Sequence, residues 1–393
     1  MDVFGLLLFV LGLASSNLSA YNGHFSVMDY GATSDDQTDD SQAFLEAWNA
    51  ACTALHLQSS TVYVPPQKTF LLNPIIFHGP CNPARINFLI SGTIMAPESA
   101  GEWDGRDASE WLGFKNVNGL HVDGFGLVDG QGKAWWDQSC KYHPQLALKF
   151  MSCNESSVSN LKVVNSAQTH IVVKACNRFN IDNLVIESPG NSPNTDGIHI
   201  QSSHNVFLTN SKIGAGDDCI SIGDYISNIE IRNVECGPGH GISIGSLGRD
   251  GNYVQVEKIR VIDAVFNGTS NGARIKTWQA GRGYVRDVTF QNLKFSYVKN
   301  PIIIDQNYCY IRNACEEQES GVQISNVNYK EVSGTSSTEI AINLNCSKFV
   351  PCFGISMESI QLMSAKAGND VVASCSNAYG QELDVFPAPC LLR

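Results

Sequence analysis

The sequence predicts an all-β protein, a parallel β-helix in which short strands stack as the rungs of one coil. Two independent series of residues support this prediction, because their steps along the chain nearly match. The first series consists of apolar residues two positions apart: Leu148/Phe150, Ile171/Val173, Ile198/Ile200, Ile220/Ile222, Ile242/Ile244, Ala273/Ile275 and Ile302/Ile304. The second consists of asparagines about ten residues later: Asn160, Asn183, Asn210 and Asn233. Residues two apart on a strand point the same way, so the apolar pairs fill the interior and the asparagines form the corners between strands.

The composition is consistent with one repeat domain over residues 21–393. The chain has 393 residues, of which 43% are hydrophobic and only 16% are charged. Repeat folds of this length often form a single domain. The formal net charge of −12 predicts that nucleic acid is not a partner, because phosphate binding requires a basic surface. A polyanionic substrate would need a local patch of positive charge.

Residues 1–20 have the pattern of a secretion signal peptide. Val3 to Leu13 form an apolar run that is too short to span a bilayer, and it ends in small residues, first Ala14 to Ser16 and then Ser19 and Ala20. The segment before this run carries Asp2 and no Lys or Arg, so a buried first strand is the alternative interpretation. No later apolar stretch is long enough to span a membrane. We therefore expect a secreted protein that does not span the membrane once the signal is removed.

An amphipathic helix is predicted near the N-terminus. Asp39, Asp40 and Ser41 offer an N-cap. Apolar residues then follow at helical spacing: Phe44, Leu45, Trp48, Ala51, Cys52 and Leu55. The first rung of a β-coil exposes apolar surface and unpaired strand edges, and a helix at this position would cover them.

Thirteen cysteines in a chain with a secretion signal predict disulfide bonds. Cys219 and Cys236 lie one rung apart beside the most polar stretch, so we expect a bridge between them. Two local bridges near the C-terminus are also predicted, Cys346 with Cys352 and Cys375 with Cys390. The odd count leaves at least one cysteine over. Three N-glycosylation sequons agree with the secretory route, at Asn154, Asn267 and Asn345.

Candidate chemistry is concentrated between Asn194 and Gly248. Asp196, Asp218 and His240 follow one another at intervals of 22 residues, each just before an apolar run. Asp217 lies one residue earlier, at a Gly-rich turn. Alignment of the rungs on their isoleucine pairs predicts one outward column: His199, Ser221, Ser243 and Arg274, with Lys276 pointing the same way. Because adjacent rungs are about 4.8 Å apart, these groups should converge on one patch.

Three neighbouring carboxylates cannot all ionise freely, so at least one should have a raised pKa. Glycoside hydrolysis requires this combination of a protonated acid and an ionised carboxylate. Arg274 and Lys276 add the cations that a carboxylate-bearing sugar would need. A metal is the other interpretation of an acid cluster. Calcium would suit three aspartates, but the adjacent cations oppose it, and zinc bound by cysteines is not expected in an oxidising compartment.

Four motifs in this order resemble the polygalacturonases, glycoside hydrolase family 28. They are Asn194-Thr195-Asp196, Gly216-Asp217-Asp218, Gly239-His240-Gly241 and Arg274-Ile275-Lys276. The resemblance implies a right-handed parallel β-helix without cofactor or metal, and hydrolysis of α-1,4-linked galacturonic acid with inversion. It also implies that Asp217 is the general acid, that Asp196 and Asp218 activate water, and that His240 supports the acid. Substrate contacts are expected from four residues: Asn194, Arg274, Lys276 and Tyr308.

Within the family, the chain is most similar to the plant members. The overall length and the segment NSPNTDGIHI resemble the pollen-type exopolygalacturonases. The expected protein is a monomer that is secreted to the plant cell wall and acts on pectate, with exo action favoured over endo action. Two rival functions remain, a calcium-dependent pectate lyase on the same coil and a wall-binding β-helix without activity.

Overall fold

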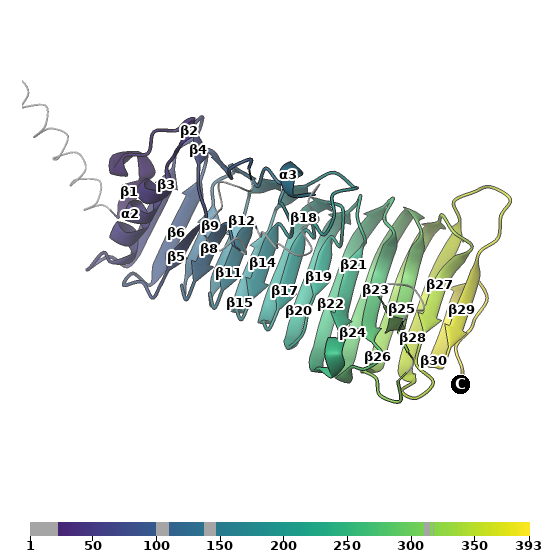
Figure 1. Cartoon of the computed structure of the whole chain (residues 1–393). Helices are drawn as coiled ribbons and strands as arrows, with labels where there is room; N and C mark the ends of the chain where they lie inside the picture. Colours follow the sequence, from purple (N-terminus) through teal and green to yellow (C-terminus); the bar gives the residue numbers. More distant parts are fainter. Residues whose placement is uncertain (1–22, 100–109, 137–146, 310–314, 317) are drawn as a thin grey trace, which may run out of the picture.

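The computed structural model describes residues 23–99, 110–136, 147–309, 315–316 and 318–393. Figure 1 shows one elongated coil in which the rungs follow one another along the axis from the N-terminal to the C-terminal end. The predicted signal segment, residues 1–20, lies outside the described residues. Every strand pairing between successive rungs is parallel, which confirms the predicted β-helix.

One face of the coil is an 11-stranded sheet, to which each rung contributes one strand. In spatial order its strands are β5 (Ile75–His78), β8 (Leu112–Lys115), β11 (Leu148–Met151), β14 (Ile171–Lys174), β17 (Ile198–Gln201), β19 (Ile220–Ile222), β21 (Ile242–Leu247), β23 (Asn271–Trp278), β25 (Asn300–Tyr308), β27 (Ile340–Asn345) and β29 (Val372–Ser376).

The remaining strands form a 19-stranded sheet from two ladders that join at β18 (His204–Gly214). The first ladder runs through β1 (His24–Ser26), β3 (Ser59–Val64), β6 (Arg85–Ile90), β9 (Leu120–Asp123), β12 (Ser156–Ser159) and β15 (Asn177–Asp182). The second runs through β2 (Asp35–Asp39), β4 (Thr69–Leu71), β7 (Thr93–Met95), β10 (Leu127–Asp129), β13 (Lys162–Val164) and β16 (Val185–Glu187).

Beyond β18, one long strand per rung replaces the two short ones. These strands are β20 (Ile226–Cys236), β22 (Tyr253–Asn267), β24 (Arg282–Val298), β26 (Gln323–Ser336), β28 (Cys352–Ser364) and β30 (Ala378–Phe386). Three short helical segments lie outside the sheets: η1 (Val27–Tyr30), α3 (Lys133–Trp136) and η4 (Arg249–Gly251).

The predicted apolar pairs form stacks inside the coil. Leu148 pairs with Ile171, and the stack continues through the first residue of each predicted pair as far as Ile302. All of these side chains are buried. Phe150 extends the interior toward the N-terminus, where it stacks on Phe114 with 5.5 Å between ring centroids. The alternation predicted from the sequence therefore fixes which face of each strand is interior.

The asparagine series lies at the corners, as predicted. Asn160, Asn183, Asn210 and Asn233 all have positive φ between 51° and 55°. Asparagine tolerates this left-handed geometry better than most residues. Asn183 donates to Asn160 at 2.7 Å and Asn233 donates to Asn210 at 2.8 Å. The ladder changes partner once, because Asn210 donates to Asp182 at 2.7 Å.

Helix α2 (Ser41–Cys52) covers the N-terminal end of the coil, as predicted (Figure 1). Its Trp48 is buried against Phe77, with 5.2 Å between ring centroids, and donates through Nε1 to the carbonyl of His78 at 3.0 Å. The predicted apolar series ends earlier than expected, because Leu55 lies beyond the helix and is 69% exposed. Asp40 occupies the N-cap position, but its carboxylate accepts from Thr33 and Ser34 rather than from the helix.

All three predicted disulfides are present, Cys219–Cys236, Cys346–Cys352 and Cys375–Cys390. Two more join Cys52 to Cys81 and Cys309 to Cys315. Cys153 and Cys176 are buried and unbridged. Among the described residues, no helix has the length and apolar character to cross a membrane.

Candidate active site

The outer face of the 11-stranded sheet carries the predicted outward column. His199 on β17 pairs with Ser221 on β19, Ser221 with Ser243 on β21, and Ser243 with Arg274 on β23. Their neighbours along each strand, such as Ile198 and Ile200, point into the coil and are buried. Because alternate residues of a strand point outward, four successive rungs place polar side chains on one surface.

The acids lie where these strands begin, one rung apart. The amide of Gly197 donates to the carbonyl of Asp218 at 2.9 Å, so Asp196 and Asp218 occupy equivalent positions. The amide of Gly216 donates to the hydroxyl of Thr195 at 2.9 Å, which ties the two aspartate motifs together. A Cβ at Gly216 would lie 1.8 Å from the carbonyl oxygen of Ser192, so this turn requires glycine.

Asp218 lies at the centre of a buried ion cluster and is 2% exposed. Its Oδ1 accepts from the Arg274 guanidinium at 2.5 Å and from the Ser243 hydroxyl at 2.8 Å. Its Oδ2 accepts from the Lys276 ammonium at 3.0 Å. Arg274 also donates to Ser243 at 2.7 Å, so the hydroxyl is held by both ions.

The electrostatic environment shifts the pKa values of Asp218 and Asp196 in opposite directions. Burial alone would raise the pKa of Asp218, but the charges of Arg274 and Lys276 outweigh burial and lower this pKa. Burial and the nearby charges of Asp217 and Asp218 hold the pKa of Asp196 well above its ordinary value. Asp196 is therefore the acid with a raised pKa, of the kind that the sequence predicted for one of the three.

Asp217 and His240 form a pair at the edge of this cluster. The Nδ1 of His240 lies 2.9 Å from Oδ1 of Asp217, and the His240 amide donates to the Asp217 carbonyl at 2.7 Å. The same Oδ1 accepts from the amide of Asp218 at 2.8 Å. Cys219 and Cys236 bridge directly behind this turn, as predicted. Asp217 and His240 remain partly exposed, so both can meet a ligand from solvent.

A model of the family described as glycosyl hydrolases family 28 matches residues 52–383 of the chain. The chain belongs to glycosyl hydrolases family 28.

Relatives of the chain include plant proteins. The Arabidopsis thaliana protein "Polygalacturonase QRT2" is 43% identical over 362 residues, covering 90% of this chain and 81% of its own. A "Polygalacturonase" from Prunus persica is 41% identical over 397 residues, covering 98% and 97%. The solved structure of an endo-xylogalacturonan hydrolase from Aspergillus tubingensis superimposes with a TM-score of 0.78 at 23% identity, covering 92% and 98%. This likeness confirms the right-handed parallel β-helix.

The two other predicted substrate contacts lie on either side of the acids in this family 28 hydrolase. Tyr308 ends β25 beside the cluster, with the Lys276 ammonium 5.5 Å from its ring centroid. Asn194 lies with Asp196 in a cleft of about 350 Å³, on the N-terminal side of the acids. The predicted catalytic and substrate-binding residues thus lie on one side of the coil.

Three residues of the site were missed by reasoning from sequence, or were placed without a role. Ser243 couples Arg274 to Asp218, although the sequence indicated only that it faces outward. Thr195 is buried and joins the two aspartate motifs. His170 was not anticipated. Its Nδ1 lies 2.9 Å from the backbone carbonyl of Asp196 and its Nε2 lies 2.8 Å from the Ser188 hydroxyl.

Two histidines near Asp196, His170 and His199, are held neutral. Burial lowers the pKa of His170 to about 4 and the pKa of His199 to about 4. A carbonyl only accepts, so Nδ1 of His170 carries the proton that is donated to Asp196. This hydrogen bond fixes the backbone of the segment that carries Asp196.

Three side chains in this family 28 site have the chemistry of metal ligands. One ligand atom each of Asp217, Asp218 and His240 lies within 4.8 Å of the others. Both oxygens of Asp218 already bind cationic side chains, however, and Nδ1 of His240 faces Asp217. A metal ion would therefore have to displace Arg274 and Lys276, and the absence of a metal requirement remains a prediction.

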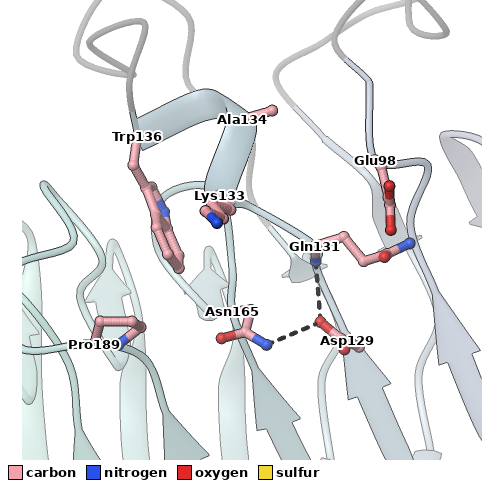
Figure 2. A pocket seen from close by; sticks show the side chains of 8 residues that line it. All are labelled: Glu98, Asp129, Gln131, Lys133, Ala134, Trp136, Asn165 and Pro189. Atoms are coloured by element: carbon pink, nitrogen blue, oxygen red, sulfur yellow. Dashed lines mark hydrogen bonds between the residues drawn. The ribbon is translucent and has the colours of Figure 1, made fainter.

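A second hollow of about 680 Å³ lies beside the cleft (Figure 2). Trp136 hangs into it from α3, next to Lys133, and its Nε1 donates to the carbonyl of Ser166 at 3.0 Å. Asn165 donates to Asp129 at 3.3 Å on the floor of this hollow. The turn that contributes Asn165 here contributes Gln168 and Thr169 to the cleft with Asp196, so this turn forms the wall between the two.

The predicted glycosylation sites differ in accessibility. Asn267 is exposed at the end of β22. The amide of Asn345 donates to Asp305 at 3.1 Å, and that of Asn154 is partly buried. Glycosylation at all three remains a prediction, and Asn267 offers the most accessible side chain.

Replacing Asp196 with asparagine is expected to raise the melting temperature by a few degrees at pH 7 and to leave it unchanged near pH 4. Because the pKa of Asp196 is raised in the folded state, its contribution to stability is full at low pH and is lost as the pH rises through the folded pKa. The substituted asparagine side chain stays neutral throughout. Thermal unfolding of both proteins across this range measures the effect. A melting-temperature difference that does not grow with pH would contradict the assigned direction.

Proposed function

We propose that this chain is a polygalacturonase, which hydrolyses α-1,4-galacturonosyl linkages in polygalacturonate. The observation that carries the proposal is the ion cluster in which Asp218 is held ionised by Arg274 and Lys276 beside Asp196, whose pKa is raised. Glycoside hydrolysis needs one carboxyl group that donates a proton and one that stays ionised. Asp218 is the group held ionised, and Asp217 lies next to it at the partly exposed edge of the cluster. The names of the relatives from Arabidopsis thaliana and Prunus persica agree with this activity.

The proposed roles follow from geometry and resemblance together. Asp217 is the general acid, because its carboxyl group is partly exposed at the edge of the cluster and His240 can return a proton to it. Asp218 and Asp196 orient and activate the water. Asp196 must lose its proton to act as a base, so activity should fall as the pH drops below its raised pKa.

The cations are proposed to bind the carboxylate of the substrate as well as Asp218. The contacts of Arg274 with the described residues of the cluster use its Nε and one terminal nitrogen, so the second terminal nitrogen can bind a ligand. Lys276 contacts the ring of Tyr308, so a sugar bound there would meet both a cation and an aromatic face. Arg274 and Lys276 supply the local positive charge that a chain with a net charge of −12 needs in order to bind a polyanion.

Inversion is part of the proposal and rests on the family resemblance. Ligand atoms of Asp217 and Asp218 approach within 4.8 Å of each other, which is closer than the roughly 6.5–9.5 Å usual between the carboxyl groups of inverting glycosidases. Inversion at this site therefore requires water to be held between Asp196 and Asp218 rather than between Asp217 and Asp218.

We propose exo action, with release of galacturonic acid from chain ends, on the basis of the NSPNTDGIHI segment. The size profile of products from polygalacturonate early in the reaction tests this proposal. Exo action predicts monomer alone from the first time points. A ladder of mixed oligomers would show endo action and overturn the exo assignment, while leaving the polygalacturonase proposal intact.

We further propose that the mature protein is a monomer secreted to the plant cell wall. The N-terminal apolar segment, the three sequons and the five disulfides support this location. Its partner there is pectate, and neither nucleic acid nor a membrane is expected to bind it. Immunodetection in the cell-wall fraction of the expressing tissue tests the location.

A further inference from the structure

The cleft on the N-terminal side of Asp196 carries positive charge that the proposed mechanism does not use. It has a volume of about 350 Å³, at the lower end of the range for small-ligand sites, which suits one sugar unit. Its floor is formed by the outward side chains of β11, β14 and β17. Two of these are lysines: Lys149 pairs with Val172 of the next rung, and Lys174 pairs with Gln201 of the rung after that.

The positions of the lysines match those of the cations on the other side of the acids. On β23, Ala273 and Ile275 point inward and Arg274 and Lys276 point outward. On β14, Ile171 and Val173 point inward in the same way. Lys174 is therefore the outward residue of β14 that corresponds to Lys276 of β23. Figure 1 shows β17 and β19 between β14 and β23, and Asp196 and Asp218 lie just before the starts of β17 and β19. Cations therefore flank the acids on both sides along the axis of the coil.

Only one of the two lysines is available for a ligand. The Lys149 ammonium is largely buried and forms an ion pair with Glu110, which neutralises it. Within the described parts of the chain, no acidic or hydrogen-bonding group engages the ammonium of Lys174, which is half-buried in the cleft. The charge of Lys174 nevertheless acts on the floor of the cleft. It adds to the effect of burial in lowering the pKa of His199. An unneutralised cation in a cleft beside the catalytic acids favours an anionic ligand.

We propose that Lys174 binds the carboxylate of a galacturonate unit in a subsite on the N-terminal side of the catalytic acids, with the amide of Gln201 beside it. This inference rests on the proposed function. It adds that the enzyme reads a free carboxylate on both sides of the scissile bond, through Arg274 and Lys276 on one side and Lys174 on the other. Lys174 is then a specificity residue that disfavours methyl-esterified units in this subsite.

The test compares Lys174→Gln and Lys174→Arg with wild type and with Lys212→Gln. Lys212 is a matched control because it lies on β18 of the other sheet and its side chain is 63% exposed. On polygalacturonate at low ionic strength, Lys174→Gln should lose about tenfold in kcat/KM, chiefly through KM, because a charge-assisted hydrogen bond is lost. Lys174→Arg, which keeps the charge, should recover most of the loss, and Lys212→Gln should match wild type.

Two further readouts exclude a merely structural role for Lys174. The ratio of kcat/KM on polygalacturonate to that on partly methyl-esterified pectin should fall in Lys174→Gln. The difference in kcat/KM between wild type and Lys174→Gln should also become smaller as the salt concentration is raised, because screening weakens the attraction between Lys174 and the substrate carboxylate. Equal losses in Lys174→Gln and Lys174→Arg, or no loss in either, would overturn the inference while wild type stays active. An inactive wild type would instead overturn the proposed function.

Discussion

Replacing Asp217 with asparagine is expected to lower kcat on polygalacturonate about 10³-fold, within the range that general acid catalysis contributes. Asparagine has nearly the same shape and keeps an oxygen that can accept from the Asp218 amide, which lies 2.8 Å from Oδ1 in the native protein. It cannot give a proton to the leaving oxygen. His240, 2.9 Å away, would lose the carboxylate with which it exchanges a proton.

The measurement is the initial rate of reducing-end release by Asp217→Asn and wild type, with thermal unfolding recorded on the same preparations. The matched control is Asp250→Asn, because the Asp250 side chain is 82% exposed and pairs only with its neighbour Arg249 among the described residues. The control should keep wild-type activity. A rate for Asp217→Asn within tenfold of wild type, with the fold intact, would remove Asp217 from the role of acid.

Replacing Asp218 with asparagine is expected to abolish activity and to lower the free energy of unfolding by about 3 kcal/mol, as breaking a buried ion pair commonly does. Asp218 is 2% exposed and is the shared partner of Arg274 and Lys276, whose side chains are 13% and 10% exposed. A neutral amide leaves two largely buried cations next to each other without the carboxylate that both of them bind. The destabilisation therefore comes from the cations that remain as well as from the bonds that are lost.

The pH dependence distinguishes this explanation from simple misfolding. Because the pKa of Asp218 is lowered in the folded state, its contribution to stability is present above the unfolded pKa and is lost as the pH falls through the folded pKa. The stability gap between Asp218→Asn and wild type should thus be largest at neutral pH and shrink in strong acid. Adding Lys276→Met to Asp218→Asn should recover part of the loss. A double variant less stable than Asp218→Asn would contradict the proposed charge imbalance.

The parts of the fold that repeat could be predicted from the sequence. Ile198 and Ile220 pair because each begins a strand with the same inward period, and any slip of one residue would turn the apolar side chains outward. Asn183 and Asn233 mark corners because asparagine adopts a positive φ more readily than most other residues. Rung alignment also brought Arg274 within reach of Asp218, across 56 residues of sequence.

What could not be predicted depends on side-chain choices within the assembled coil. The sequence placed Arg274 and Lys276 near the acids, but not that both would bind Asp218 directly. His170 lies outside the four motifs. Its role in holding the segment of Asp196 follows only from the 2.9 Å contact between its Nδ1 and the Asp196 carbonyl. The merging of two ladders at β18 was also missed, because the asparagine corner at Asn210 lies within one continuous strand. The Cys52–Cys81 bridge joins the capping helix to the segment before β6, and no spacing indicated this contact.

The most direct test of the proposed function is the mass of the products that the purified wild-type protein releases from polygalacturonate in the presence of a metal chelator. Hydrolysis without a metal predicts saturated galacturonic acid products, each cleavage adding one water, with no gain in ultraviolet absorbance. Unsaturated products that absorb in the ultraviolet and disappear with chelator would identify a calcium-dependent lyase. The absence of any product from a folded protein would show that the coil binds pectate without cleaving it, and either result would contradict the assignment.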